Sequence, residues 1–109
     1  MATTYKVLGQ VAPSATTLTT LDTVPAATSA VVSTIAVCNR AATAATYRIA
    51  IRPAGAAISN EHYIAYDSTV AANDTTMLTI GITLAATDVI SVYASTANLS
   101  FNAFGSEIS

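Results

Sequence analysis

The feature that most restricts the fold of this chain is an alternation of apolar and polar residues with a period of two, in segments rich in Thr, Val and Ile. β-Branched side chains are restricted at χ1 and favour the pleated backbone of a strand. No segment of helical period extends beyond about two turns. Residues 1–109 are therefore expected to form one all-β domain, a single antiparallel β-sandwich of about eight strands with a jelly-roll or immunoglobulin-like topology.

Turn residues set the limits of the expected strands, because Pro, Gly, Asn and Asp interrupt a pleated backbone. The expected strands are residues 3–10, 16–24, 30–39, 46–52, 62–69, 76–84, 89–95 and 98–104, followed by a tail at 105–109. Segment 76–84 is expected to be one continuous strand. Only a short turn separates it from 89–95, so these two segments are predicted to pair as a hairpin.

Segment 30–39 has apolar residues at both odd- and even-numbered positions, which is typical of a strand buried on both faces. Its two faces are expected to carry Val31, Ile35 and Val37, and Val32, Ala36 and Cys38, respectively. Cys38 is the only cysteine, so no disulfide can form within the chain. At the end of a buried strand it is expected to act as a small hydrophobic residue.

Charge is scarce, with four Lys and Arg residues, six Asp and Glu residues, and 9% charged residues in total. An average soluble protein carries about 25%. The net charge of -2 and the lack of a basic cluster argue against nucleic-acid binding. No apolar run approaches the ~20 residues of a membrane span, and no signal peptide is recognised, so synthesis in a cytoplasm without membrane insertion is expected. Low charge favours a subunit that covers part of its surface with partners.

Catalytic and metal-binding groups are too few for an enzyme or a cofactor site to be expected. His62 is the only histidine, and neighbouring carboxylates cannot complete a set of three or four metal ligands with it. The chain has no Gly-x-Ser-x-Gly elbow and no phosphate-binding glycine loop. His62 is therefore interpreted as a surface or interface residue. Asp67 is expected to pair across the sheet with Arg48 or Arg52.

The aromatic residues bear on a different function, carbohydrate binding, which requires an exposed aromatic strip. Tyr63 and Tyr66 are three residues apart, so a regular strand places them on opposite faces and at most one can join such a strip. Tyr47 and Tyr93 are expected in the core. Carbohydrate binding is therefore kept as an alternative without direct support from the sequence.

Several runs along nearly the whole chain are similar to those of small virion structural proteins of tailed bacteriophages. They are residues 20–26 (TLDTVPA), 31–40 (VVSTIAVCNR), 47–55 (YRIAIRPAG), 62–67 (HYIAYD), 81–94 (GITLAATDVISVYA) and 99–105 (LSFNAFG). The resemblance implies a particle component with a structural role. These runs describe strands and turns, and they do not describe a catalytic site.

The function that this resemblance implies first is a capsid decoration (cement) subunit, located in the virion, trimeric, and bound to the major capsid protein. A tail, baseplate or fibre component, with or without receptor carbohydrate binding, is the alternative. The residues expected to contact partners are Tyr5, Val7, Arg48, Arg52, His62, Tyr63, Tyr66 and Phe104.

Overall fold

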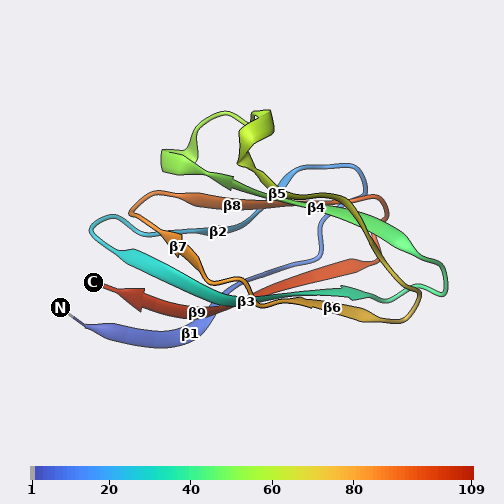
Figure 1. Ribbon diagram of the computed structural model, residues 1–109, viewed down its shortest axis with the longest axis horizontal. Coiled ribbons are helices and arrows are strands. Elements are labelled where there is room, and N and C mark those ends of the chain that lie inside the picture. Colours follow the sequence, from blue (N-terminus) through green and yellow to red (C-terminus); the bar gives the residue numbers. More distant parts are fainter. Residues whose placement is uncertain (1) are drawn as a thin grey trace.

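A computed structural model describes residues 2–109 and shows two antiparallel sheets packed face to face (Figure 1). The strands are β1 (Thr3–Val11), β2 (Thr19–Thr23), β3 (Ser29–Asn39), β4 (Ala45–Arg52), β5 (Tyr63–Val70), β6 (Thr75–Leu78), β7 (Ile82–Leu84), β8 (Val89–Ala94) and β9 (Leu99–Ile108). Two short 3₁₀ helices, η1 (Pro53–Gly55) and η2 (Asn60–His62), lie between β4 and β5. The predicted all-β sandwich is confirmed.

The strand order identifies the topology that the sequence left open. One sheet has the order β1-β9-β3-β6, with β7 also paired to β3, and the other has the order β2-β8-β4-β5. If β6 and β7 are taken as one interrupted strand, the first strand pairs with the last, the second with the second to last, and so on inward to the β4–β5 pair. This is one long hairpin wound into two layers, which is a jelly roll.

The core lies between the two sheets and is filled by alternate residues of their inner faces. Ile35, Ile49, Val92 and Phe101 are fully buried. Tyr47 of one sheet packs edge-on against Phe101 of the other, with ring centroids 6.3 Å apart. Each large side chain of this kind contributes about 1.5–3 kcal/mol by leaving water. The core position predicted for Tyr47 is confirmed.

Segment 76–84 is interrupted, and its predicted hairpin with 89–95 is wrong. β6 and β7 both pair with β3, and the residues between them include Gly81, which has a φ of +63°. Ile80 consequently leaves the sheet and is 54% exposed. β8 pairs with β2 and β4 in the opposite sheet, so the turn after β7 crosses between the layers. The predicted tail at 105–109 is also wrong, because β9 continues to Ile108 between β1 and β3.

The two faces of β3 differ from the prediction because the strand contains a bulge. Its register with β9 shifts between Val32 and Thr34, so one extra residue reverses the alternation. Val32 therefore faces the core together with Ile35, and Val31 faces outward. The outer face of β3 is not covered by a second layer, so the prediction of a strand buried on both sides is wrong.

Candidate functional site

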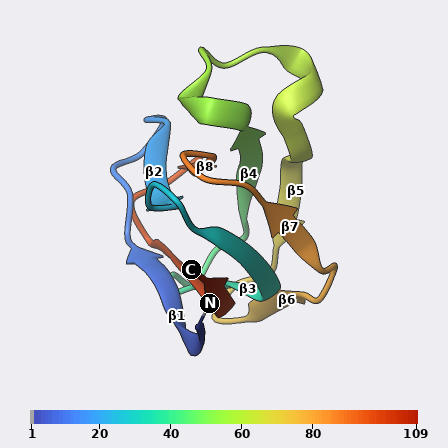
Figure 2. The ribbon, with the colours of Figure 1, turned by 90° about the vertical axis from the view of Figure 1, so that its left-hand side faces the viewer.

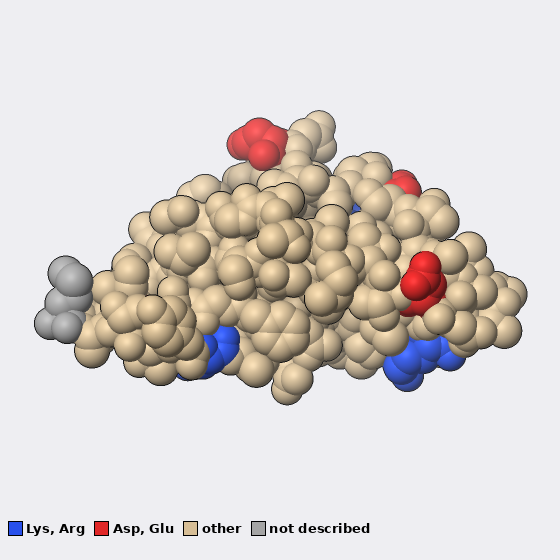
Figure 3. All heavy atoms as spheres, turned by 60° about the horizontal axis from the view of Figure 1, so that its bottom comes forward, with Lys and Arg blue, Asp and Glu red and all other residues tan. Residues whose placement is uncertain are grey.

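The outer face of the β1-β9-β3-β6 sheet carries no charged side chain at the register positions that point outward, and we call it the neutral face. Its members, taken from strand register and burial, include Tyr5, Val7, Gln10, Val31, Thr34, Ala36, Cys38, Thr75, Met77, Thr83, Ser100, Asn102, Phe104 and Ser106. In Figure 3 the middle of this face is free of charged atoms, and the blue and red atoms lie toward its ends.

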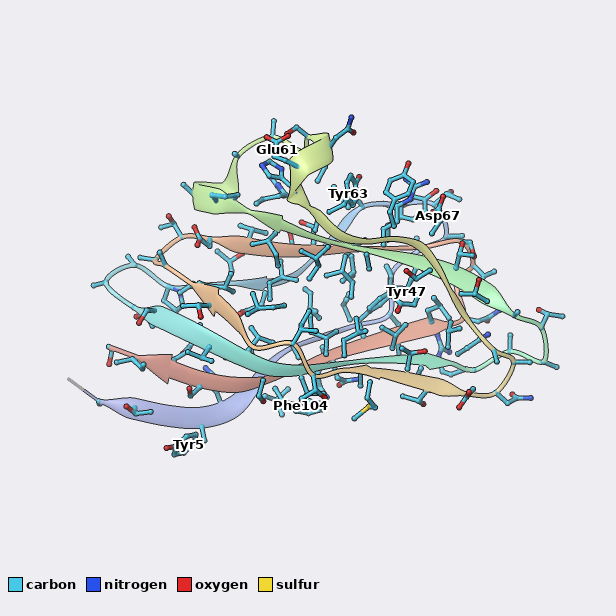
Figure 4. All side chains as sticks on the ribbon, in the orientation of Figure 1. Tyr5, Tyr47, Glu61, Tyr63, Asp67 and Phe104 are labelled. Atoms are coloured by element: carbon cyan, nitrogen blue, oxygen red, sulfur yellow. The ribbon has the colours of Figure 1, made fainter. Side chains whose placement is uncertain are left out.

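Large apolar side chains on the neutral face are open to solvent. Tyr5 is 85% exposed and Met77 is 58% exposed, while Val7 is exposed beside the half-buried Phe104. Figure 4 shows Tyr5 and Phe104 on this same side of the molecule. Cys38 also points to this face and is partly exposed, so its predicted burial is wrong. Exposed apolar side chains among uncharged Thr, Ser, Asn and Gln residues on one sheet face are characteristic of a protein–protein contact.

The charges near one end of this sheet point inward instead. Lys6 and Glu107 occupy inner register positions and form an ion pair with Nζ and Oε1 3.2 Å apart. Asp22 of β2 interacts electrostatically with both members of this pair. Among residues 2–109, its buried Oδ2 has no hydrogen-bond partner. Burial raises the pKa of the Asp22 carboxyl above 3.8, with the negative charge of Glu107 as a smaller cause. The ionised Asp22 is therefore less favourable in the fold than in the unfolded chain.

Substituting Asp22→Asn is expected to raise the free energy of unfolding at neutral pH. A carboxyl whose folded pKa is raised loses stability as pH rises from its unfolded pKa, 3.8, through the raised folded value. The variant has no carboxyl at this position and does not lose this stability. The free energies of unfolding of the two proteins are therefore expected to become equal only at pH values below that window. Urea unfolding across acidic to neutral pH measures the difference. A variant less stable than the parent at neutral pH would contradict the assignment.

On the opposite side of the molecule, the outer face of the second sheet carries a tyrosine–arginine cluster formed by Arg48, Tyr63, Tyr66, Asp67 and Tyr93. The guanidinium carbon of Arg48 lies 4.1 Å from the ring centroid of Tyr66 and 4.3 Å from that of Tyr93. Arg48 Nε donates to Asp67 Oδ1 over 2.7 Å, and this bond raises the pKa of the guanidinium. The Tyr63 and Tyr66 rings meet at nearly a right angle, with centroids 5.0 Å apart.

The predicted placement of Tyr63 and Tyr66 on opposite faces is wrong, and the reason is irregular pairing. The β4–β5 register shifts twice, between Tyr47 and Ile49 and again between Ile49 and Ala50. Each extra residue on β5 reverses the side to which the following side chains point. Tyr93 likewise stacks on the outer face instead of lying in the core. The predicted pairing of Asp67 with an arginine is confirmed for Arg48.

His62 is not a surface residue, since its side chain is only 9% exposed. Its Nδ1 accepts a hydrogen bond from the backbone N–H of Ser59 over 3.1 Å, which closes the short helix η2. The hydroxyl of Ser59 also lowers the pKa of Glu61, which remains exposed. His62 therefore organises the segment between β4 and β5, which stands above the four-stranded sheet in Figure 2.

Arg52 is committed to the same segment. Its Nε donates to the carbonyl of Ala56 over 2.7 Å, and its Nη2 donates to that of Gly55 over 3.0 Å. A third bond joins Nη1 to the hydroxyl of Ser91. Arg52 thus fixes the turn after β4 onto the sheet, and these donors are used within the domain.

The eight residues expected to contact partners divide into three groups. Tyr5, Val7 and Phe104 lie on the neutral face, whereas Arg48, Tyr63 and Tyr66 belong to the tyrosine–arginine cluster. Arg52 and His62 serve the β4–β5 segment. Met77 and Tyr93 were not predicted as surface residues. For Met77 the sequence did hold a signal, because in a strand it must point to the side opposite its neighbour Leu78.

Within residues 2–109, no group of three or more His, Cys, Asp or Glu side chains is arranged to hold a metal ion. No helix of the described chain is long and apolar enough to cross a membrane. No protein-family model, curated protein or solved structure matches this chain.

Proposed function

We propose that this protein is a structural subunit of a phage particle, a capsid decoration subunit that docks on the shell through its neutral face. The observation that carries the proposal is the set of exposed apolar side chains, including Tyr5 and Met77, on a sheet face without charge. Covering such a face removes apolar area from water and desolvates little charge, since Arg40, which donates to Ser100 over 2.9 Å, lies at its end. The sequence resemblance to phage virion proteins is the reason for proposing that the assembly is a phage particle.

The size of the neutral face suits this role. Four strands about 4.8 Å apart and roughly ten residues long at about 3.3 Å each define a face of about 600 Å². A standard protein–protein interface buries about 800 Å² on each partner. The neutral face therefore accounts for most of one standard contact. Neighbouring subunits in a homo-trimer, the oligomer that we propose, would add further contact area.

The fold is compatible with this role. Jelly rolls occur in viral capsid domains, in lectins and in cupins, so the likeness is an analogy at the level of architecture. The proposal depends on the surface, and the surface can be tested directly.

Val7→Glu is expected to weaken binding to particles that lack the protein by tenfold or more, equivalent to about 1.4 kcal/mol. The substitution places a charge on the neutral face, where docking would bury it unpaired. Val7 is exposed, so folding is expected to be unaffected. Co-sedimentation with particles measures binding, and Thr20→Glu, at an exposed position of β2 in the other sheet, is the matched control. Equal binding by both variants would exclude the neutral face as the docking surface.

Immunogold labelling of parent virions distinguishes the head from the tail. Label over the head is expected for a decoration subunit. Label on the tail or its tip would replace this proposal with a tail, baseplate or fibre role. Light scattering of the free protein tests the proposed trimer separately. A strict monomer that also fails to bind particles would overturn the structural role.

A further inference from the structure

We propose that the tyrosine–arginine cluster is a carbohydrate-binding site that takes a neutral pyranose with vicinal hydroxyls, stacked on Tyr66 and hydrogen-bonded by Arg48 and Asp67. This site lies on the sheet opposite the neutral face, and it does not depend on the proposed docking role. Three observations carry the inference: a left-handed backbone inside a strand, an exposed aromatic ring, and polar groups with unused hydrogen-bonding capacity.

The backbone at Asp67 is the first observation. Asp67 has a φ of +50°, the left-handed conformation that costs a non-glycine residue roughly 1–2 kcal/mol. The other non-glycine residues with positive φ among residues 2–109 lie in turns or in η1, whereas Asp67 lies within a strand. The irregular pairing here brings Tyr66 to the outer face beside Arg48 and Tyr63. Asp67 therefore lies at the bulge itself, and bulges that re-aim side chains are over-represented next to functional sites.

The ring of Tyr66 is the second observation. Arg48 covers one face of the ring at 4.1 Å, yet the residue remains 57% exposed. The Tyr63 ring packs against it nearly at a right angle, with centroids 5.0 Å apart, and Figure 4 shows Tyr63 and Asp67 above the ribbon on this side. The face of an aromatic ring is electron-rich. It attracts the weakly positive C–H groups on the apolar face of a pyranose ring.

The Arg48–Asp67 pair is the third observation. A guanidinium has five N–H donors, and Arg48 directs two bonds to Asp67, through Nε at 2.7 Å and Nη2 at 3.4 Å. Asp67 is about half exposed, and each of its two oxygens retains a free lone pair. Adjacent sugar hydroxyls can therefore donate to the carboxylate and accept from the remaining N–H groups. This planar, bidentate geometry is the one that Arg and carboxylate groups supply well.

The net charge of the pair selects the class of sugar. Arg48 and Asp67 neutralise each other, so a uronic or sialic acid finds no unpaired cation at the cluster. Arg48 is also held between two rings, which reduces the conformational entropy that binding must remove. A small, solvent-exposed site of this kind is expected to bind a monosaccharide with a dissociation constant near 1 mM.

The test is a titration of the ¹⁵N-labelled protein followed by amide chemical shifts, with glucuronate as the charged comparison. The neutral sugars are methyl glucoside, methyl galactoside and methyl mannoside, each to about 100 mM. We expect saturable shifts with at least one of them, confined to residues 63–67, 48 and 93. Tyr66→Ala is expected to weaken binding at least tenfold, whereas Tyr66→Phe, which preserves the ring, is expected to retain it. Thermal unfolding of the same variants shows whether each remains folded.

Three results would overturn the proposal: no saturable shift with any neutral glycoside, unchanged binding by a folded Tyr66→Ala variant, or preferential binding of glucuronate. Asp67→Asn provides a second variant that keeps the aromatic rings and alters only the polar contacts; undiminished binding by this variant would also overturn the assigned role of Asp67. Val7→Glu, on the opposite face, is expected to bind the sugar normally, so failure of particle docking and failure of sugar binding are separable.

Discussion

Replacing Gly105 with alanine is expected to lower the free energy of unfolding by about 2–3 kcal/mol, as in an overpacked core. A Cβ at this position would overlap the backbone carbonyl of Val31, an atom held by strand pairing. The β3 bulge brings the two backbones this close, and only glycine fits between them. The midpoint of thermal unfolding is expected to fall by roughly 10 °C or more.

Gly81→Ala is the matched control for Gly105→Ala. Gly81 has a φ of +63°, and a Cβ there would meet nothing within 4 Å. Its replacement is expected to lower the free energy of unfolding by only about 1 kcal/mol, which is the penalty of a left-handed φ for alanine. Calorimetry measures the loss of stability in both variants. Gly105→Ala reports the effect of steric overlap, and Gly81→Ala reports the effect of a strained φ. If Gly81→Ala proved the more damaging change, the close approach of β9 to β3 would be incorrect.

Asn39→Ala is expected to lower the free energy of unfolding by about 3 kcal/mol, because it leaves several buried backbone groups without partners. The side-chain amide of Asn39 donates to the carbonyls of Thr43, Val70 and Ala71 at 2.8, 3.4 and 3.2 Å. Its Oδ1 accepts from the N–H of Ala41 over 3.0 Å. One fully buried side chain thus joins the β3–β4 turn to the end of β5.

Asn102→Ala provides the comparison for Asn39→Ala. Asn102 accepts a hydrogen bond from Gln10 Nε2 over 2.7 Å, but this bond is exposed to water. Its loss is expected to change stability by no more than about 0.5 kcal/mol. Urea denaturation of the two variants measures both effects. Similar losses for the two asparagines would show that Asn39 is not the connection between these loops.

The orientation of side chains could be predicted wherever a strand is regular. The inward positions of Tyr47 and Ile49 follow from strict alternation along β4, which matches the structure. The same rule fails at Val31 and Tyr66, because β3 contains one extra residue and β5 contains two, and each extra residue reverses the side of the positions that follow it. A bulge is determined by pairing with a distant strand, and local composition carries little sign of it.

Long-range pairing explains the remaining differences. β7 and β8 are separated by a short turn, which locally favours a hairpin, yet they belong to different sheets, because β7 pairs with β3 and β8 pairs with β2 and β4. Tyr5, Val7 and Phe104 were predicted as contact residues, and the structure places them together. The cluster around Arg48 combines residues of β4, β5 and β8, which are distant in the sequence or irregularly paired. The sequence alone therefore did not predict it.

The pairing of β1 with β9 has a mechanical consequence. Ala2 and Ser109 exchange two backbone hydrogen bonds, of 2.8 and 2.9 Å, so the described chain starts and finishes at neighbouring points. Because the two strands are antiparallel, tension applied between these points would load the hydrogen bonds one after another, as in a zipper. Load applied along β3 and β9 in opposite directions would instead shear their paired residues together. The resistance of this domain to force therefore depends on where the force is applied.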